Sequence, residues 1–148
     1  AVEENGVLTP KIKLSENVIK TTTPGFKQVY RFFDENNKAI ADVVTLFDEE
    51  INENEPYELF HPEFPWKRKT VTNFKVKKLL VPIFLNGKLV YESPNIHEIR
   101  AFNRSQMETL WDEVKRLERP HQYYVDLSQK LWDLKQDLIK KHRAISNE

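Results

Sequence analysis

The chain has 148 residues, a length that fits one domain better than two. Its hydrophobic content of 39%, with three Trp, five Tyr and nine Phe, supplies the apolar surface that a disordered chain lacks, although 31% of its residues are charged. Its 23 Lys and Arg balance its 23 Asp and Glu, so the protein has no net positive charge that would attract it to nucleic acid or an anionic membrane. The absence of cysteine excludes disulfides, thiol nucleophiles and cysteine-based metal sites.

The sequence contains no apolar run near the roughly 18–20 residues needed to span a bilayer, and no signal-peptide pattern. We therefore predict a soluble domain without membrane partners. The lack of cysteine fits a reducing compartment, so the cytoplasm is the expected location. The chain begins at Ala1 rather than Met, with a strand expected from its first residues, and we expect an upstream segment in a longer protein.

The first part of the chain carries two hairpin patterns. Residues 1–8 read as two strands around the Asn5-Gly6 turn, a dipeptide that tolerates positive φ. Residues 25–33 alternate loosely between apolar and polar side chains, which suits a half-buried strand. The polar turn 34–37 follows, and the β-branched run 39–47 is the expected antiparallel partner.

A clearer hairpin lies further along the chain. Residues 79–85 and 88–91 flank Asn86-Gly87, the strongest local turn signal in the sequence. Pro82 cannot donate a ladder hydrogen bond, so its strand should lie at a sheet edge or bulge there. We predict a mostly antiparallel sheet.

The pattern changes to a helical period after Ser93-Pro94. Apolar residues from Ile96 predict a helix to about Glu118, before Pro120. Asp126, with Gln129 three residues on, resembles a capping box that opens a last helix. The predicted fold class is α+β: a single domain with mostly antiparallel β hairpins (residues 1–92) followed by two C-terminal α-helices (residues 93–148).

No residue pattern points to catalysis. The four histidines are scattered singly, without the paired spacing of a metal site. No Gly-x-Ser-x-Gly elbow is present, and one sequence does not show which carboxylates face each other across a cleft. We assign no catalytic residue and no metal ligand, and we expect no cofactor in this chain alone.

The sharpest charge feature is an acidic stretch, 48–63, followed by a basic stretch, 67–78. In one interpretation, Lys67, Arg68 and Lys69 bind phosphate or single-stranded nucleic acid, with Trp66 and Phe74 available for stacking. The favoured interpretation is that these are solvated faces that partly neutralise one another or dock on a neighbouring domain, because the net charge is zero.

The tryptophans of the two predicted helices, Trp111 and Trp132, either pack in the core or form a partner surface. Tyr123-Tyr124, between the helices, is open to the same two interpretations. We therefore name Lys67, Arg68, Lys69 and Trp111 as candidate interdomain or anion contacts.

Blocks of sequence along nearly the whole chain resemble the C-terminal domain of bacterial nicotinate phosphoribosyltransferases. No block is a chemical motif by itself, but their common order and spacing argue against chance. The blocks are Pro24-Gly25-Phe26-Lys27, Ala39-Ile40-Ala41-Asp42, Pro65-Trp66-Lys67-Arg68-Lys69-Thr70-Val71, Leu80-Val81-Pro82-Ile83-Phe84, Gly87-Lys88-Leu89-Val90-Tyr91, Thr109-Leu110-Trp111-Asp112-Glu113-Val114 and Tyr123-Tyr124-Val125-Asp126-Leu127-Ser128.

The resemblance implies an enzyme of NAD biosynthesis. Such an enzyme joins nicotinate to 5-phosphoribosyl 1-pyrophosphate, coupled to ATP hydrolysis with magnesium, and gives nicotinate mononucleotide. In the family, the phosphoribosyl site and the phosphorylated histidine belong to an upstream α/β barrel and its companion domain, so no catalytic residue carries over to this chain. The resemblance implies a non-catalytic accessory domain that contacts the barrel of the same polypeptide or a neighbouring subunit. The alternative is a free-standing binding module that uses the basic segment from Lys67 to Lys78.

Overall fold

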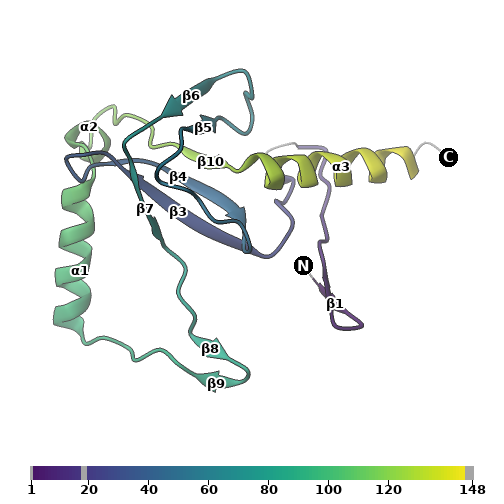
Figure 1. Ribbon diagram of the computed structural model, residues 1–148, viewed down its shortest axis with the longest axis horizontal. Helices are drawn as coiled ribbons and strands as arrows, with labels where there is room; N and C mark the ends of the chain where they lie inside the picture. The colour runs from purple at the N-terminus through teal and green to yellow at the C-terminus, as the bar shows by residue number, and fades with distance from the viewer. Residues whose placement is uncertain (1, 18–19, 146–148) are drawn as a thin grey trace.

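The computed structural model describes residues 2–17 and 20–145 and is built around a four-stranded sheet (Figure 1). Strand β3 (Lys27–Phe33) pairs antiparallel with β4 (Ala39–Leu46) on one side and with β7 (Lys75–Lys78) on the other. Strand β10 (Val125–Leu127) pairs with β4 in parallel, which gives the order β10-β4-β3-β7. The α+β prediction is confirmed, but the sheet gains a parallel strand from the far end of the chain.

The β3–β4 hairpin forms where the sequence predicts it, because its turn is stabilised locally. The carboxylate of Asp34 accepts hydrogen bonds from the backbone N–H groups of Asn36 (2.9 Å) and Lys38 (2.8 Å). Asn37 takes the positive φ of 58° that this residue type tolerates. The turn therefore fixes the register of the two longest strands.

A two-stranded sheet covers one face of the main sheet. It consists of β5 (Tyr57–Phe60) and β6 (Arg68–Val71), paired antiparallel. The ring of Phe32 lies 4.8 Å from the ring of Phe74 and 5.0 Å from that of Tyr57. The hydrophobic core lies between the two sheets and contains Tyr30, Phe32, Ala41, Val43, Leu59, Val71 and Phe74.

Two small hairpins lie at the periphery, and both have the Asn-Gly turns that the sequence predicts. Strands β1 (Val2–Glu4) and β2 (Val7–Thr9) flank the first turn, while Ala1 lies outside the described residues. Strands β8 (Phe84–Leu85) and β9 (Lys88–Leu89) flank the second. All four turn residues have positive φ, as a type I′ turn requires. The second hairpin has only two residues per strand and stays outside the main sheet.

The predicted helix from Ile96 is shorter in the structure. Helix α1 (Ile96–Thr109) begins with a capping box between Asn95 and Glu98. Leu110 and the next residue are extended, so the short helix α2 (Asp112–Lys115) is separate. Near the break, the Thr109 hydroxyl donates to the carbonyl of Gln106 (2.7 Å), a side-chain bond of the kind that competes with helical pairing. No helix among the described residues has the length and apolar character needed to cross a membrane.

The last helix, α3 (Gln129–Ile145), starts from a different cap than the sequence suggests. Asp126 is part of β10, where pairing with β4 keeps it extended, so the predicted capping role is wrong. Instead, the hydroxyl of Ser128 accepts a hydrogen bond from the N–H of Leu131 (3.2 Å) and donates to Glu49 (2.7 Å). The cap thus fastens α3 to the segment that follows β4.

Gly25 is placed so that any larger residue would be strained. Its φ is +99°, and an added Cβ would lie 3.0 Å from Cδ2 of Leu46 and 3.7 Å from Cδ2 of Leu134. We expect Gly25→Ala to lower the free energy of unfolding by about 1 kcal/mol, measured by urea denaturation. Gly6→Ala is the matched control, since Gly6 also has positive φ (+77°) but meets no atom within 4 Å. Equal losses in both variants would show that close packing at Gly25 has no effect of its own.

Candidate functional site

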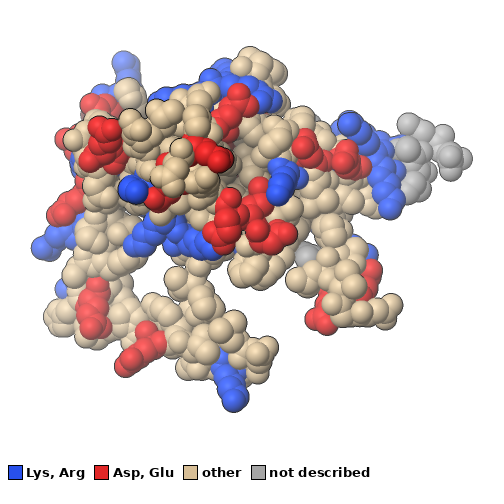
Figure 2. Space-filling model, in the orientation of Figure 1, with Lys and Arg blue, Asp and Glu red and all other residues tan. Residues whose placement is uncertain are grey.

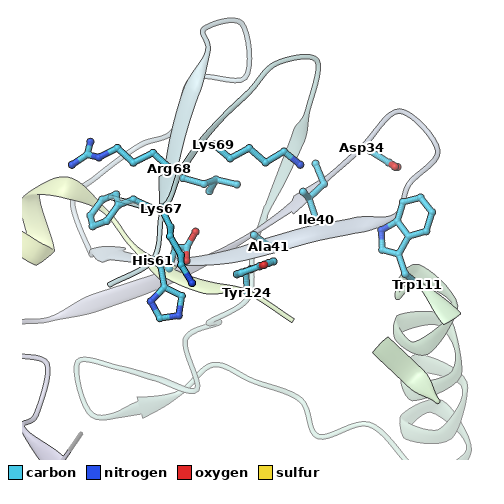
Figure 3. A pocket seen from close by; sticks show the side chains of 12 residues that line it. Asp34, Ile40, Ala41, His61, Lys67, Arg68, Lys69, Trp111 and Tyr124 are labelled. Atoms are coloured by element: carbon cyan, nitrogen blue, oxygen red, sulfur yellow. The ribbon is translucent and has the colours of Figure 1, made fainter. Parts of the chain in front are cut away.

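A pocket of about 630 Å³ opens beside the covered face of the main sheet (Figure 3). Residues from β4, β6, the start of β10 and the break between α1 and α2 line it, which brings distant parts of the sequence together. All four candidate residues are among them. The lining residues are Asp34, Ile40, Ala41, Leu59, Phe60, His61, Lys67, Arg68, Lys69, Trp111, Tyr124 and Asp126.

The basic side of the pocket comes from β6 and the residue before it. In Figure 3, Lys67 extends toward His61 and Lys69 toward Ile40, whereas the guanidinium of Arg68 points away from Trp111. The Lys67 ammonium lies 4.8 Å from the centre of the Phe64 ring. Within residues 2–17 and 20–145, neither lysine side chain forms an ion pair or a hydrogen bond. These two ammonium groups are therefore available to an acidic group that enters the pocket.

Arg68 is already engaged within the domain. Its guanidinium pairs with the carboxylate of Glu58, donates to the carbonyl of Pro65 (2.9 Å) and lies 5.2 Å from the centre of the Phe60 ring. Although it lines the pocket, its charge is compensated by a partner on the neighbouring strand. Of the three basic candidates, Arg68 is thus the one with a structural role.

The aromatic side of the pocket is open. Trp111 is 46% exposed at the break between α1 and α2, and Tyr124 is 55% exposed just before β10. Within the described part of the chain, the Trp111 indole N–H and the Tyr124 hydroxyl donate no hydrogen bond. Trp132, by contrast, is half-buried, donates to the carbonyl of Pro62 (3.3 Å) and packs edge-on against Phe60. The two tryptophans therefore differ: Trp111 faces outward, and Trp132 belongs to the packing of α3.

Asp126 lies at the base of the pocket. The residue is 4% exposed, and its Oδ1 has no hydrogen-bond partner. Burial raises the pKa of this carboxyl to about 6, and the nearby His61 opposes the shift. The Nδ1 of His61 accepts from the backbone N–H groups of Glu63 (3.2 Å) and Phe64 (3.3 Å), so the neutral ring carries its proton on Nε2. The pocket thus combines cations at its rim with one buried, unpaired acid.

The rest of the basic stretch is paired with the acidic stretch. Lys75 bonds Glu53 at 2.9 Å, and Lys78 bonds Glu50 at 2.6 Å. The Lys78 ammonium lowers the pKa of Glu50, while the backbone N–H of Val76 and then Lys75 lower that of Glu53. Lys and Arg atoms gather over β6 in Figure 2, with acidic atoms close by. This arrangement agrees with the prediction of mutually neutralising faces.

The two aromatic residues predicted to assist stacking are not equivalent. Phe74 is buried in the core and is inaccessible to a ligand. Trp66 is 73% exposed and packs edge-on against Phe64 (5.4 Å between ring centres). Sequence reasoning missed Tyr124, His61 and Asp126 as pocket residues. The pairing of β10 with β4 brings Tyr124 and Asp126 to the pocket, and the pairing of β5 with β6 brings His61.

The pocket has the chemistry of a binding site. No nucleophile is hydrogen-bonded to a base among its lining residues. In the part of the chain that the structure describes, no group of three His, Asp or Glu is placed to hold a metal ion. The fold is that of a small α+β domain, and its open pocket combines two unpaired lysines, two exposed aromatic rings and one buried acid.

Comparison with known proteins identifies the family. Residues 26–135 match the family of the nicotinate phosphoribosyltransferase C-terminal domain. This match covers most of the chain, so the chain belongs to that family.

Individual relatives carry the same enzyme name. The chain is 39% identical over 140 residues to nicotinate phosphoribosyltransferase of Bacillus subtilis, covering 94% of this chain and 29% of the relative. It is 37% identical to the enzyme of Caenorhabditis elegans, covering 83% of this chain and 22% of the relative. The crystal structure of human nicotinic acid phosphoribosyltransferase is similar with a TM-score of 0.72 and 28% identity, over 80% of this chain and 24% of that one. The chain thus spans less than a third of the length of these relatives.

Proposed function

We propose that this chain serves as the C-terminal domain of a nicotinate phosphoribosyltransferase and has no catalytic activity by itself. The whole enzyme would join nicotinate to 5-phosphoribosyl 1-pyrophosphate, with ATP and magnesium, and produce nicotinate mononucleotide for NAD biosynthesis. The family match over residues 26–135 is the observation that carries this proposal. We expect the enzyme to act in the cytoplasm.

The pocket supports a role in docking rather than in chemistry. Phosphoribosyl transfer requires a preorganised site that fixes a pyrophosphate, a metal ion and the leaving group together. Magnesium takes one or two carboxylates together with phosphate and water oxygens. The pocket's donors do not fit it, because cationic side chains line the rim and, among the described residues that line it, Asp126 is the one carboxylate that is not already engaged. Asp34 already bonds its own turn.

The open side chains indicate what would dock there. Lys67 and Lys69 present uncompensated ammonium groups, and Trp111 presents a half-exposed ring. An acidic segment that also carries an apolar or aromatic side chain would pair with the two ammonium groups and pack on the Trp111 ring. The upstream barrel of the same polypeptide or a neighbouring subunit would supply this segment. We therefore keep Lys67, Lys69 and Trp111 as interdomain contacts and assign Arg68 to the structure of β6.

The first test is product formation. We expect the full-length polypeptide to form nicotinate mononucleotide from nicotinate, phosphoribosyl pyrophosphate, ATP and magnesium, and this 148-residue chain to form none. An inactive full-length polypeptide would contradict the proposed enzyme. Turnover by the chain alone would contradict its role as an accessory domain.

The second test addresses the docking role. In the full-length enzyme, Lys67→Glu with Lys69→Glu and Trp111→Ala should lower the thermal midpoint and reduce activity, because the new glutamates repel an acidic partner and the partner no longer packs on an indole ring. Lys140→Glu with Lys141→Glu, at two exposed positions on α3, is the matched charge control. The docking role fails if the triple variant behaves like this control.

The second candidate function is binding of phosphate or single-stranded nucleic acid. The two unpaired lysines beside Trp111 and Tyr124 favour it, whereas the zero net charge and the pairing of Arg68, Lys75 and Lys78 with glutamates disfavour it. Fluorescence anisotropy with a labelled oligonucleotide discriminates between the docking role and nucleic-acid binding. An affinity that falls steeply with salt would support the nucleic-acid function.

A further inference from the structure

Residues 80–109, here called the arm, extend away from the main sheet and carry the β8–β9 hairpin and helix α1 (Figure 1). The arm is fastened at its two ends. At its start, the N–H of Leu79 donates to the carbonyl of Val29 (2.8 Å). At its end, the ammonium of Lys38 donates to the carbonyl of Glu108 (2.8 Å). Between these points, every residue from 80 to 105 is exposed.

The hairpin of the arm and one side of α1 expose apolar side chains. In the hairpin, Phe84 is 64% exposed and Leu89 is 65% exposed. On α1, the exposed residues Ile96, Ile99 and Phe102 follow the helical period and form one stripe. Residues 80–94 include only two charged side chains, Lys88 and Glu92, in a protein that is 31% charged. A contiguous apolar patch of this kind marks an interaction surface.

The arm also lacks the internal support that its elements need. A two-stranded hairpin is marginally stable in water, and a helix of 14 residues is near the lower limit of independent stability. The β8–β9 hairpin has two residues per strand and pairs with no third strand in the described part of the chain. Its ordered shape is therefore expected only when a partner covers it.

The face of the main sheet that is turned away from the β5–β6 sheet lies beside helix α1 of the arm. Cross-strand pairing puts Val29 opposite Val44 on the face away from the β5–β6 sheet, and Val125 shares that face. Val29 and Val44 are half-buried, and Val125 is 52% exposed. Lys77, also on this face, lies 5.8 Å from the ring of Phe102 on α1. The sheet face and α1 are thus neighbours, but the ion pair of Arg31 and Asp42 occupies the middle of the sheet face, so the exposed apolar surface belongs mainly to the arm.

We propose that the arm holds an apolar segment of the same polypeptide, from outside the 148 residues. This inference rests on the proposed function, which makes the chain one part of a longer enzyme. The chain covers 29% of the Bacillus subtilis relative, so most of such a polypeptide is available to fill the site. The human structure shares the fold over 80% of this chain, and the matched part makes up 24% of that protein.

The composition of the arm sets the chemistry of its occupant. With almost no charge on the hairpin, a charged partner would lose its hydration without gaining ion pairs, so the occupant must present aliphatic or aromatic side chains. A covalently linked segment has an effective concentration in the millimolar range, far above that of a second copy of the protein. The intrachain segment is therefore favoured over arm-to-arm pairing of two copies.

Photo-crosslinking of the full-length enzyme tests the identity of the occupant. p-Benzoylphenylalanine placed at Phe84 should give a product at the mass of one polypeptide, with the crosslinked peptide outside the 148 residues. The same probe at Arg104, on the charged side of α1, is the matched control and should give little product. Crosslinks that double the mass would show that a second copy fills the site. Crosslinks confined to the 148 residues would show that the arm folds back on its own domain. Either result would overturn the proposal.

A stability measurement tests whether the contact matters. In the full-length enzyme, Phe84→Ser with Leu89→Ser should lower the thermal midpoint, whereas Arg104→Ser should leave it unchanged. Equal midpoints for the two variants, with no crosslink at Phe84 above the control, would reject the proposal. Nicotinate mononucleotide formation is measured on the unmodified enzyme, so failure of the proposed function is detected separately from failure of the arm contact.

Discussion

Replacing Asp42 by Ala is expected to lower the free energy of unfolding of this chain by about 3–5 kcal/mol, the range for removing one partner of a buried ion pair. Asp42 is 8% exposed on β4. Its carboxylate accepts two hydrogen bonds from Arg31 on β3, at 2.8 Å from Nε and 2.9 Å from the second nitrogen. The Tyr123 hydroxyl donates to the same carboxylate at 2.9 Å.

The loss is large because the substitution leaves polar groups without partners. The hydrogen bonds that Arg31 donates to Asp42 raise the pKa of Arg31, so its half-buried guanidinium stays charged. Burial, followed by the negative charge of Asp42, raises the pKa of Tyr123, which keeps the phenol protonated as a donor. In Asp42→Ala both donors are left without their acceptor, and no side-chain hydrogen bond to residue 42 then joins β3 and β4 to the segment before β10.

Urea denaturation of the variants checks this prediction. Lys11→Ala breaks an exposed ion pair with Glu4 (2.8 Å) and should leave the midpoint unchanged. The double variant Arg31→Met with Asp42→Leu should be less destabilised than Asp42→Ala, because it leaves no unpaired guanidinium. If the single variant were no less stable than the Lys11 control, the cluster would have no structural role.

The features that the sequence predicts correctly depend on neighbouring residues. Asn5-Gly6 and Asn86-Gly87 each adopt the turn, because two consecutive residues with positive φ are sufficient to specify it. The β3–β4 hairpin follows from Asp34 and the β-branched run of β4. The resemblance to the phosphoribosyltransferase family also holds, since it rests on many short blocks in one order.

The features that the sequence does not predict depend on distant residues. Asp126 and its neighbours resemble a helix start, and only pairing with Asp42, Val43 and Val44 makes them a strand. The same pairing adds Tyr124 and Asp126 to the pocket lining, through a strand whose own pattern gives no signal. The break after Thr109 is equally hidden in the sequence, because the apolar period of α1 continues past it.

Asp126 provides the second large effect, with the opposite sign. We expect Asp126→Asn to raise the free energy of unfolding by about 2 kcal/mol at pH 7, allowing for solvent screening at the pocket. Burial raises the pKa of this carboxyl from 3.8 to about 6, so the ionised group at pH 7 is disfavoured in the folded state. An amide occupies the same space without charge.

The predicted gain depends on pH in a defined direction. Between pH 4 and pH 6 the folded protein keeps the Asp126 proton that the unfolded chain releases, so the folded state binds more protons. The stability of the unsubstituted chain must then fall as pH rises through this interval. The advantage of Asp126→Asn should be full above pH 6 and disappear toward pH 4.

Urea midpoints of both proteins between pH 4 and pH 8 measure this difference. Asp137→Asn removes the same charge from an exposed position on α3 and controls for net charge. A gain of equal size in the control would mean that net charge, not burial, is responsible. A loss of stability in Asp126→Asn at pH 7 would contradict the prediction. It would mean that a favourable partner already stabilises the charge of the buried carboxylate at the base of the pocket.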